Sequence, residues 1–395
     1  MTEISGAVLP PDVSHPFSPA GRADPYPAYQ WLRENSPVHY DRLSRLWFVT
    51  AHADCAAVLA DRRFSASLGQ RQRTRDDELP VSMLNSDPPD HGRLRGPGAL
   101  LLGPAALRVA APDFEAAAHR LADGLAGQDV ADPTADIGEP FAVEVFARVL
   151  TLPPERRATF TDLARRISVN LDPLAGPAAG RAGTAAAGEF AEFAQQHVEA
   201  LEAAGVSCPL TRLAADRRLT RSEMLGIVSL AVVGGFLPLA DLAGQAAYWL
   251  TTQGRSFECF AQPAAEMNSQ AIDELLRLAT PIPFTARVAT QPVELHGVLV
   301  PAGARALVIT AAANRDPAVF ADPDSFDPLR SPNPHLAFGA GPHVCLGAPL
   351  VRLAGGVLLG ELARRFPGLR QLGTAEWDTP LVPRRLRGQR LLLRP

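Results

Sequence analysis

The sequence contains no lysine among its 395 residues, so all 38 strongly basic side chains are arginines. Any anion that the protein binds is therefore met by guanidinium groups or by histidine. With 42 acidic residues the formal net charge is -4, which argues against the basic excess that nucleic-acid binding requires. A hydrophobic share of 47% is too high for an intrinsically disordered chain.

Cysteine is also scarce, with only Cys55, Cys208, Cys259 and Cys345. Their wide spacing predicts no disulfide framework, and reduced thiols in a cytoplasmic protein are the natural interpretation. The N-terminus has neither the basic nor the apolar segment of a signal peptide. The longest nearly continuous apolar run, 227–240, is too short to span a bilayer and ends at Asp241. We therefore expect a soluble protein without a membrane anchor.

The pattern of the chain predicts mainly helix, with a small amount of strand divided between its two ends. The first twenty residues are rich in proline, and we expect an extended arm there. Helical patterns extend through most of 90–250 and return over 261–278 and 348–365. Alternating apolar residues and turn signals predict a hairpin in 37–50 and further strands in 284–309 and 381–393. Length alone allows two or three domains, and no internal repeat is present.

The most informative segment is 338–347, which reads FGAGPHVCLG. It places Cys345 directly before a predicted helix, whose N–H groups and positive end would stabilise a thiolate. Gly339, Gly341 and Gly347 permit positive φ angles and the close approach of a flat ligand. A cradle that presents one sulfur in this way suits a haem iron. For a lone cysteine, by contrast, a buried and inert thiol would be the default interpretation.

This segment resembles the haem-binding signature of the cytochrome P-450 family, FxxGxHxCxG, at every specified position. The family pattern continues on both sides, over about 24–395, so the resemblance covers nearly the whole chain. It implies one P-450 domain over 1–395, a helix-rich prism that holds haem b between a long central helix and the helix after the cysteine. It also implies that Cys345 ligates the iron and that Phe338, Gly339 and Gly347 form its cradle.

The resemblance assigns further residues by position. Glu274 and Arg277, in ELLR, match the family's ExxR pair and share one helix face, and Arg330 matches their third partner. The implied Glu–Arg–Arg network is buried and holds the loop under the haem. Four basic residues match contacts to the haem propionates, although each could instead be a surface cation: His91, Arg95, Arg287 and His343.

The central helix departs from the family pattern (A/G)Gx(D/E)T, in which the acid and the alcohol deliver protons for oxygen cleavage. Gly234 and Gly235 match the small pair, but Leu237 replaces the acid and Pro238 replaces the threonine. Neither replacement has a side-chain proton to give. Pro238 also removes a helix N–H, which predicts a kink and leaves a carbonyl without its partner. Asp241 is a candidate for a remote proton source, or else a helix residue that faces a loop.

Three interpretations of this departure stay open. In the first, a substrate hydroxyl or a water chain supplies the protons and the enzyme is a monooxygenase. In the second, it uses peroxide or a substrate rearrangement, although peroxide-using relatives usually carry an Arg-Pro pair where Leu237 and Pro238 stand here. In the third, the protein is a haem-binding accessory or sensor without oxidase activity, although accessory relatives tend to lose the cysteine.

Family position also predicts the substrate pocket. Apolar walls would come from Val233, Phe236, Ile282 and Phe284, as in most small-molecule sites. Arginines 71, 73 and 75 lie in a polar loop over 65–84. They could hold a carboxylate or a carrier-bound phosphopantetheine, or they could be solvated and balanced by the three acids at 76–78.

The resemblance implies a haem-thiolate monooxygenase that oxidises a small or medium organic molecule, most plausibly a natural-product intermediate. The chain has no flavin or iron–sulfur signature, so its electrons would come from a separate ferredoxin-type protein. Arg352, Arg364 and Arg365 could meet such an acidic partner on the cysteine side, as could any charged surface. We expect a monomer that acts on a free or carrier-tethered substrate.

Overall fold

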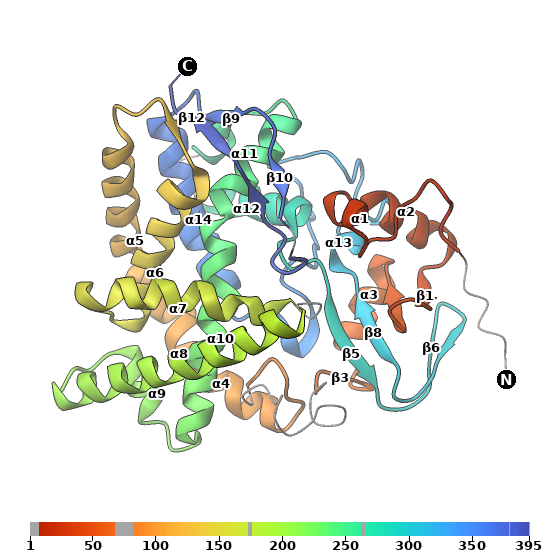
Figure 1. Cartoon of the computed structure of the whole chain (residues 1–395), viewed down its shortest axis with the longest axis horizontal. Coiled ribbons are helices and arrows are strands. Elements are labelled where there is room, and N and C mark those ends of the chain that lie inside the picture. The colour runs from red at the N-terminus through yellow and green to blue at the C-terminus, as the bar shows by residue number, and fades with distance from the viewer. Residues whose placement is uncertain (1–7, 68–81, 173–175, 262–264, 379, 395) are drawn as a thin grey trace.

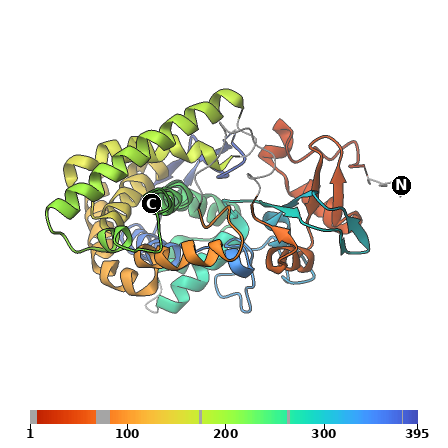
Figure 2. The same cartoon turned by 90° about the horizontal axis from the view of Figure 1, so that it is seen from below.

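The computed structural model describes residues 8–67, 82–172, 176–261, 265–378 and 380–394. Helices form most of this part of the molecule, and a strand-rich part lies beside them, on the right in Figure 1. Figure 2, turned by 90°, shows the same two parts side by side. The sequence prediction of a mainly helical protein with a small β portion is confirmed.

The helical part is built around α10 (Arg221–Ala240), which begins at a capping box between Thr220 and Glu223. Almost every residue after Met224 is apolar, so the helix can be covered on several sides, and α6, α7 and α8 pack against it. The surrounding helices are α4 (Asp90–Leu102), α5 (Pro104–Leu125), α6 (Glu139–Leu150), α7 (Arg157–Ile167), α8 (Pro177–Ala203) and α9 (Pro209–Ala214).

The stretch Arg221–Thr252 consists of α10, Asp241 and α11 (Leu242–Thr252). Judged by length and composition alone, it is long and apolar enough to cross a membrane. Its continuous length exceeds the apolar run that the sequence suggested, because α11 follows α10 after a single residue, Asp241. In this structure 56% of its most apolar window is buried inside the protein, as expected of a core helix.

The main sheet has the order β1-β2-β8-β5-β3, and its only parallel pair is β2 with β8 among the described strands. Its strands are β1 (Val38–Asp41), β2 (Leu46–Val49), β3 (Phe64–Ser65), β5 (Thr285–Ala289) and β8 (Arg305–Val308). The predicted hairpin in 37–50 is thus confirmed. Four helices lie with the sheet in the strand-rich part: α1 (Pro19–Ala23), α2 (Tyr26–Asn35), α3 (His52–Ala60) and α13 (Thr310–Ala313).

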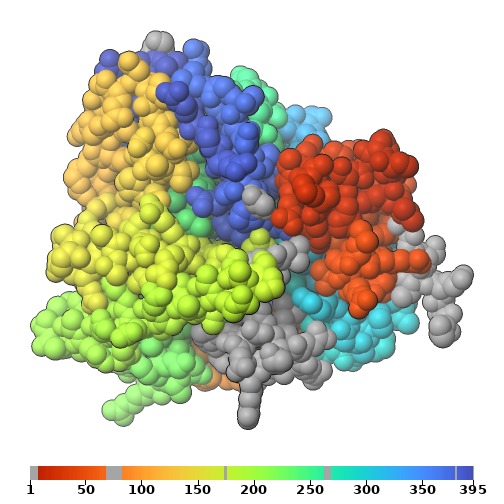
Figure 3. Space-filling model, viewed as in Figure 1, coloured from red at the N-terminus to blue at the C-terminus, as the bar shows by residue number. Residues whose placement is uncertain are grey.

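Short strands elsewhere connect distant parts of the chain. They are β4 (Val130–Ala131), β6 (Val293–Leu295), β7 (Val298–Val300), β9 (Arg370–Leu372), β10 (Glu376–Trp377), β11 (Leu386–Arg387) and β12 (Arg390–Leu392). On the face in Figure 3, the C-terminal residues, in blue, lie between the N-terminal segment, in red, and the helices in yellow. The strand character predicted for 381–393 is present in β11 and β12 only.

The predicted extended arm overlaps α1, which begins at Pro19. Residues 1–7 lie outside the described residues. Between 8 and 18 the chain forms turns, and the rings of His15 and Phe17 pack against Phe48 of β2. Apolar contacts therefore attach this segment to the sheet.

Two helices position the candidate site. α12 (Ala265–Ala279) carries the ExxR pair and differs by a few residues from the predicted 261–278. α14 (Ala348–Arg365) follows Cys345 and has the bounds that the sequence predicted. The two helices pack against each other. The segment from 314 to 340 lies between them in sequence and contains no helix or strand, so its conformation depends on polar contacts.

Candidate active site

The Cys345 loop directs backbone donors at the sulfur. Gly347 is the N-cap of α14, and the N–H groups of Gly347 and Ala348 both bond the thiol, as predicted for a cysteine at a helix start. The Cys345 residue as a whole is exposed, but burial of its thiol raises the thiol pKa. The two N–H groups and nearby arginines lower that pKa. The sulfur is therefore partly desolvated by the surrounding chain.

Glycines shape the loop around that sulfur. Gly339 and Gly341 have φ angles of +68° and +67°, which L side chains rarely adopt. A Cβ on Gly341 would lie 2.6 Å from the carbonyl oxygen of Leu59, so any other residue would displace the chain there. A Cβ on Gly347 would lie 3.7 Å from the sulfur of Cys345 and would occupy the space beside it. The loop thus keeps one side of the sulfur clear, as a planar ligand requires.

The structure brings the four predicted propionate contacts together. The rings of His91 and His343 are 4.1 Å apart, although they come from α4 and from the loop before Cys345. Burial, Arg287, His91 and Arg95 together lower the pKa of His343 to about 4. Burial, followed by Arg95, also lowers the pKa of His91. Among the described acids, Asp87 acts on both histidines, and it already accepts hydrogen bonds from the hydroxyl of Ser65 and the N–H of Ala66.

This basic cluster is short of anions. Arg287 is 4% exposed, and within the described residues its guanidinium bonds only Thr285 and the carbonyl of Ala286. Burial lowers the pKa of Arg287, and the ring nitrogen Nε2 of His91 is buried without a partner among the described residues. Buried cations are normally paired, because an isolated charge in the interior is costly. The residues therefore fit a ligand that combines a planar, apolar body with carboxylates, such as haem.

We expect Arg287→Leu to change two properties in opposite directions. Without haem, the free energy of unfolding of the variant should be about 1–3 kcal/mol higher than that of the unaltered protein, because a buried and unpaired cation is removed. With haem, it should lose the cofactor faster, because one carboxylate contact is removed. Urea unfolding of the apoprotein and transfer of haem to apomyoglobin measure the two effects. A variant that is less stable without haem would contradict the assignment.

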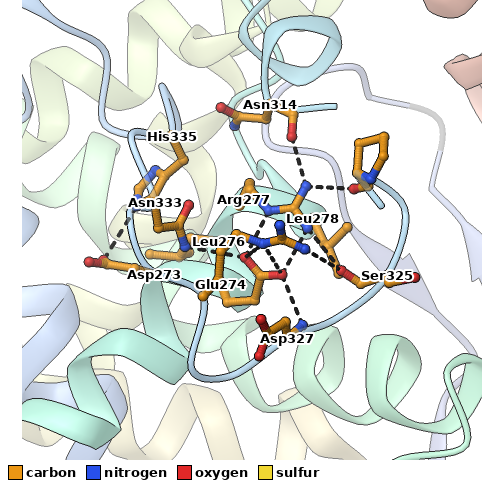
Figure 4. A network of polar contacts seen from close by, with 12 residues as sticks. Asp273, Glu274, Leu276, Arg277, Leu278, Asn314, Ser325, Asp327, Asn333 and His335 are labelled. Carbon is orange, nitrogen blue, oxygen red and sulfur yellow. Dashed lines mark hydrogen bonds and ion pairs between the residues drawn. The ribbon is translucent and has the colours of Figure 1, made fainter. Parts of the chain in front are cut away.

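The ExxR residues form a buried polar network (Figure 4). Nε and Nη2 of Arg277 each donate a hydrogen bond of 2.8 Å to the carboxylate of Glu274, and both side chains are 0% exposed. Arg330 reaches the same carboxylate at 3.1 Å. Burial favours the protonated acid, but Arg277 and Arg330 hold the pKa of Glu274 below its ordinary value. The remaining Arg277 donors bond carbonyls of the loop, those of Asn314, Pro323 and Ser325.

Sequence reasoning did not identify several members of this network. The amide of Asn333 and the N–H of Asp327 also bond Glu274, and Asn314 accepts the N–H of Leu336 at 2.6 Å. Asp273, directly before Glu274, binds His335 and Arg352. The signal was available in the many Asn, Asp and Pro residues of 314–340, but composition does not say which carbonyl meets which donor.

The central helix turns two different faces to its surroundings. Gly234 is exposed and has no atom within 4 Å of its Cβ position, whereas a Cβ on Gly235 would lie 2.8 Å from the ring of Phe146. Gly235 therefore permits close packing of α6. Leu237 is 7% exposed and Pro238 is partly buried, and both lie within one turn of Gly234. The helix continues through Pro238 to Ala240 and is interrupted at Asp241.

Asp241 is engaged in an ion pair. Its carboxylate binds the fork of Arg385 at 2.6 and 3.0 Å and accepts a hydrogen bond from Thr134. The residue is 5% exposed, and burial raises the pKa of its carboxyl group. The geometry supports attachment of the C-terminal strands to the helix end, and it does not show Asp241 together with Gly234 or Cys345.

The predicted pocket residues are divided among three places. The ring of Phe236 is fully buried against Phe146 and Phe160, about 200° around the helix from Gly234, so it belongs to the core. Ile282 and Phe284 lie in a separate apolar cluster beside the sheet. Val233 is partly buried on α10. The loop arginines 71, 73 and 75 and the acids 76–78 lie outside the described residues.

A cleft of about 700 Å³ lies between α5, α6 and α8, far from these residues in sequence. Charged side chains such as Asp113, Glu144 and Arg157 line it, and several of them pair with one another across it. None of the predicted site residues lines this cleft. We therefore keep the candidate site at Cys345.

Comparison with known proteins agrees with this geometry. Residues 253–380 match the family model of cytochrome P-450. Nocardicin C N-oxygenase of Nocardia uniformis subsp. tsuyamanensis is 36% identical, with 90% of this chain and 92% of the relative covered. The cytochrome P-450 monooxygenase PikC of Streptomyces venezuelae is 30% identical, over 88% and 85%. The crystal structure of P450BioI with a fatty-acid-ligated acyl carrier protein has a TM-score of 0.88 at 26% identity, over 94% of this chain and 99% of the other. Because a family signature, a fold and relatives that span nearly the whole chain all agree, the chain belongs to the cytochrome P-450 family and is a monooxygenase.

Proposed function

We propose that this enzyme oxidises a small or medium natural-product intermediate with dioxygen, using haem b ligated by Cys345. The observation that carries the proposal is the cluster of four basic side chains, short of acids, beside a partly desolvated cysteine sulfur. In this assignment His91, Arg95, Arg287 and His343 hold the two propionates. When bound, the haem would supply the redox chemistry, with the Cys345 thiolate as its ligand.

The residues of α10 support a second part of the proposal, which concerns proton delivery. Gly234 leaves space on the helix face, and Leu237 and Pro238 present an apolar surface beside it. This surface carries no side-chain proton, and Asp241 is paired with Arg385. We therefore assign proton delivery to a hydroxyl of the substrate or to a water that the bound substrate holds in place. The intact Cys345 argues against a purely accessory role.

Relatives support the substrate class. Their names include nocardicin C N-oxygenase and a monooxygenase of Streptomyces venezuelae, and one structural relative was solved in complex with an acyl carrier protein. These names support our proposal that the substrate belongs to natural-product biosynthesis, either free or carrier-tethered. We also propose a cytoplasmic monomer.

Electrons would come from a separate ferredoxin-type partner. The three arginines considered for its docking each pair with an acid of this chain: Arg352 with Asp273, Arg364 with Glu361 and Arg365 with Asp123. All three stay between 36% and 52% exposed. Their charge available to a partner is reduced by this pairing, so they do not by themselves define the docking surface.

An optical titration tests the proposal. The ferric protein is titrated with small aromatic and polyketide-like acids, each offered free and attached to a carrier protein. We expect a shift of the haem band that marks loss of water from the iron. A shift with free acids identifies a diffusible substrate, whereas a shift with tethered acids alone identifies a carrier protein as the partner.

The control is Cys345→Ser, which should lose the thiolate-type absorption of the ferrous carbon monoxide complex. Retention of that absorption in the variant would overturn the ligand assignment. Its absence from the unaltered holoenzyme would overturn the proposed function.

A further inference from the structure

The carboxylate of Asp273 lies between the two segments that flank Cys345. One oxygen, Oδ1, accepts a hydrogen bond from Nε of Arg352 at 2.8 Å and lies 3.4 Å from Nε2 of His335 (Figure 4 shows the contact with His335). His335 belongs to the loop that leads into the cysteine, and Arg352 belongs to α14, which leads away from it. One acid on α12 therefore holds both sides of the cysteine loop.

The hydrogen bonds of His335 fix its protonation. Its Nδ1 accepts the backbone N–H of Ala337 at 3.2 Å, so the proton is on Nε2, which faces Asp273. The side chain is only 3% exposed. A neutral histidine held at both nitrogens contributes orientation without charge. The charges in this group are thus those of Asp273 and Arg352.

The two partners of Asp273 both lie next to the haem-binding signature. The guanidinium carbon of Arg352 lies 4.9 Å from the ring centre of Phe338, and the ring of His335 lies 5.6 Å from the same ring. The carbonyl of Phe338 accepts the backbone N–H of Cys345 at 2.8 Å. Arg352 is also one of the charges that favour the Cys345 thiolate. A movement of Phe338 would therefore be transmitted to the cysteine backbone, and a change in the charge of Arg352 to its sulfur.

Burial alone would raise the pKa of Asp273, but His335 and Arg352 hold it below its ordinary value. The acid is therefore ionised at neutral pH and offsets the charge of Arg352. Within the described residues Arg352 contacts Asp273 and the ring of Phe338, and its charge helps to lower the pKa of the Cys345 thiol.

We propose that Asp273, with His335 and Arg352, is a positioning group that sets the electric field at the haem thiolate of Cys345. The inference rests on the proposed haem-thiolate function. It differs from the role of the Glu274 network, whose charges are enclosed and bond the loop from 314 to 333. The Asp273 group instead acts on Phe338 and on the sulfur.

The charges predict opposite effects on reduction of the ferric iron by one electron. Asp273→Asn removes a negative charge and leaves Arg352 unbalanced, which favours the reduced, more negative state. Arg352→Met removes the positive charge and should disfavour it. Each single change should alter the equilibrium constant by about tenfold, or about 59 mV. The double variant should return close to the unaltered protein, because both charges are absent.

The measurement is a spectroelectrochemical titration of the holoenzyme, with the ferrous carbon monoxide spectrum recorded for each variant. Arg364→Met is the matched control, since Arg364 lies on the same helix and pairs with Glu361. It should leave the potential unchanged. Arg352→Lys, which keeps the charge, should stay close to the unaltered protein.

Shifts of the same sign in Asp273→Asn and Arg352→Met would overturn the inference, as would shifts no larger than that of Arg364→Met. If Asp273→Asn does not retain haem, Arg352→Met and Arg352→Lys still decide the question. Loss of the thiolate-type absorption in the unaltered protein would instead overturn the proposed function, so the two failures are distinguishable.

Discussion

Replacing Arg277 by leucine should lower the free energy of unfolding by about 3–5 kcal/mol, a large share of the stability of a typical domain. The change leaves the carboxylate of Glu274 buried with only Arg330 as its charged partner. It also leaves the carbonyls of Asn314 and Pro323 without the Arg277 donor, whereas that of Ser325 keeps its hydrogen bond from Arg330. Urea unfolding followed by far-ultraviolet circular dichroism measures the effect.

Arg166→Leu is the matched control for this experiment. Arg166 also binds a carboxylate with both ends of its fork, at 2.6 and 2.7 Å from Glu189, but at the surface. Its loss should change the free energy of unfolding far less, because exposed ion pairs contribute little. If Arg277→Leu does not accumulate as folded protein, Arg330→Leu provides an intermediate case. Equal costs for Arg277→Leu and Arg166→Leu would show that burial of the network has no energetic consequence.

The double change Leu237→Glu with Pro238→Thr should reduce product formation by about 100-fold. It introduces the acid and alcohol of the family pattern, but position 237 is 7% exposed, so the new carboxylate enters an apolar surface without a partner. It would also displace the substrate hydroxyl or water to which we assign proton delivery, and small displacements at a reacting centre have effects of this size. Product yield per oxygen consumed measures the change.

Pro238→Ala separates the effect of removing the proline from the effect of adding an acid and an alcohol. It restores a helix N–H without adding a proton donor, so product formation should change by less than about tenfold. A rise in product with less uncoupled oxygen use in the double variant would show that Leu237 and Pro238 are a defect. The proposed role of the substrate in proton delivery would then be wrong.

Local patterns predicted the parts of this protein that depend on neighbouring residues. The helix at 348–365 and the hairpin at 37–50 follow from periodicity and turn residues. The Cys345 donors follow from the position of the cysteine at a helix start. Strands of two or three residues, such as β4 and β9, carry too little periodicity to be recognised, and they form only because β12 pairs with both.

Pairing over long distances was the harder part. The Asp241–Arg385 ion pair joins residues 144 positions apart, and no local pattern links them. Phe236 shows a second limit, because family position placed it in the pocket whereas the helical period turns it toward Phe146 and Phe160. The basic cluster was assigned from resemblance, and its shortage of acids became visible only when α4, β5 and the cysteine loop were brought together.

The basic cluster around Arg287 and His343 also has a consequence for the life of the protein in the cell. Without haem, the buried cations lack the carboxylates that would balance them, so the apoprotein is the less stable form. A ligand that binds only the folded form stabilises that form by mass action. Apoprotein that opens more often is exposed to proteases in proportion to its unfolded fraction. Iron starvation should therefore reduce the abundance of this enzyme after translation, without any dedicated regulator.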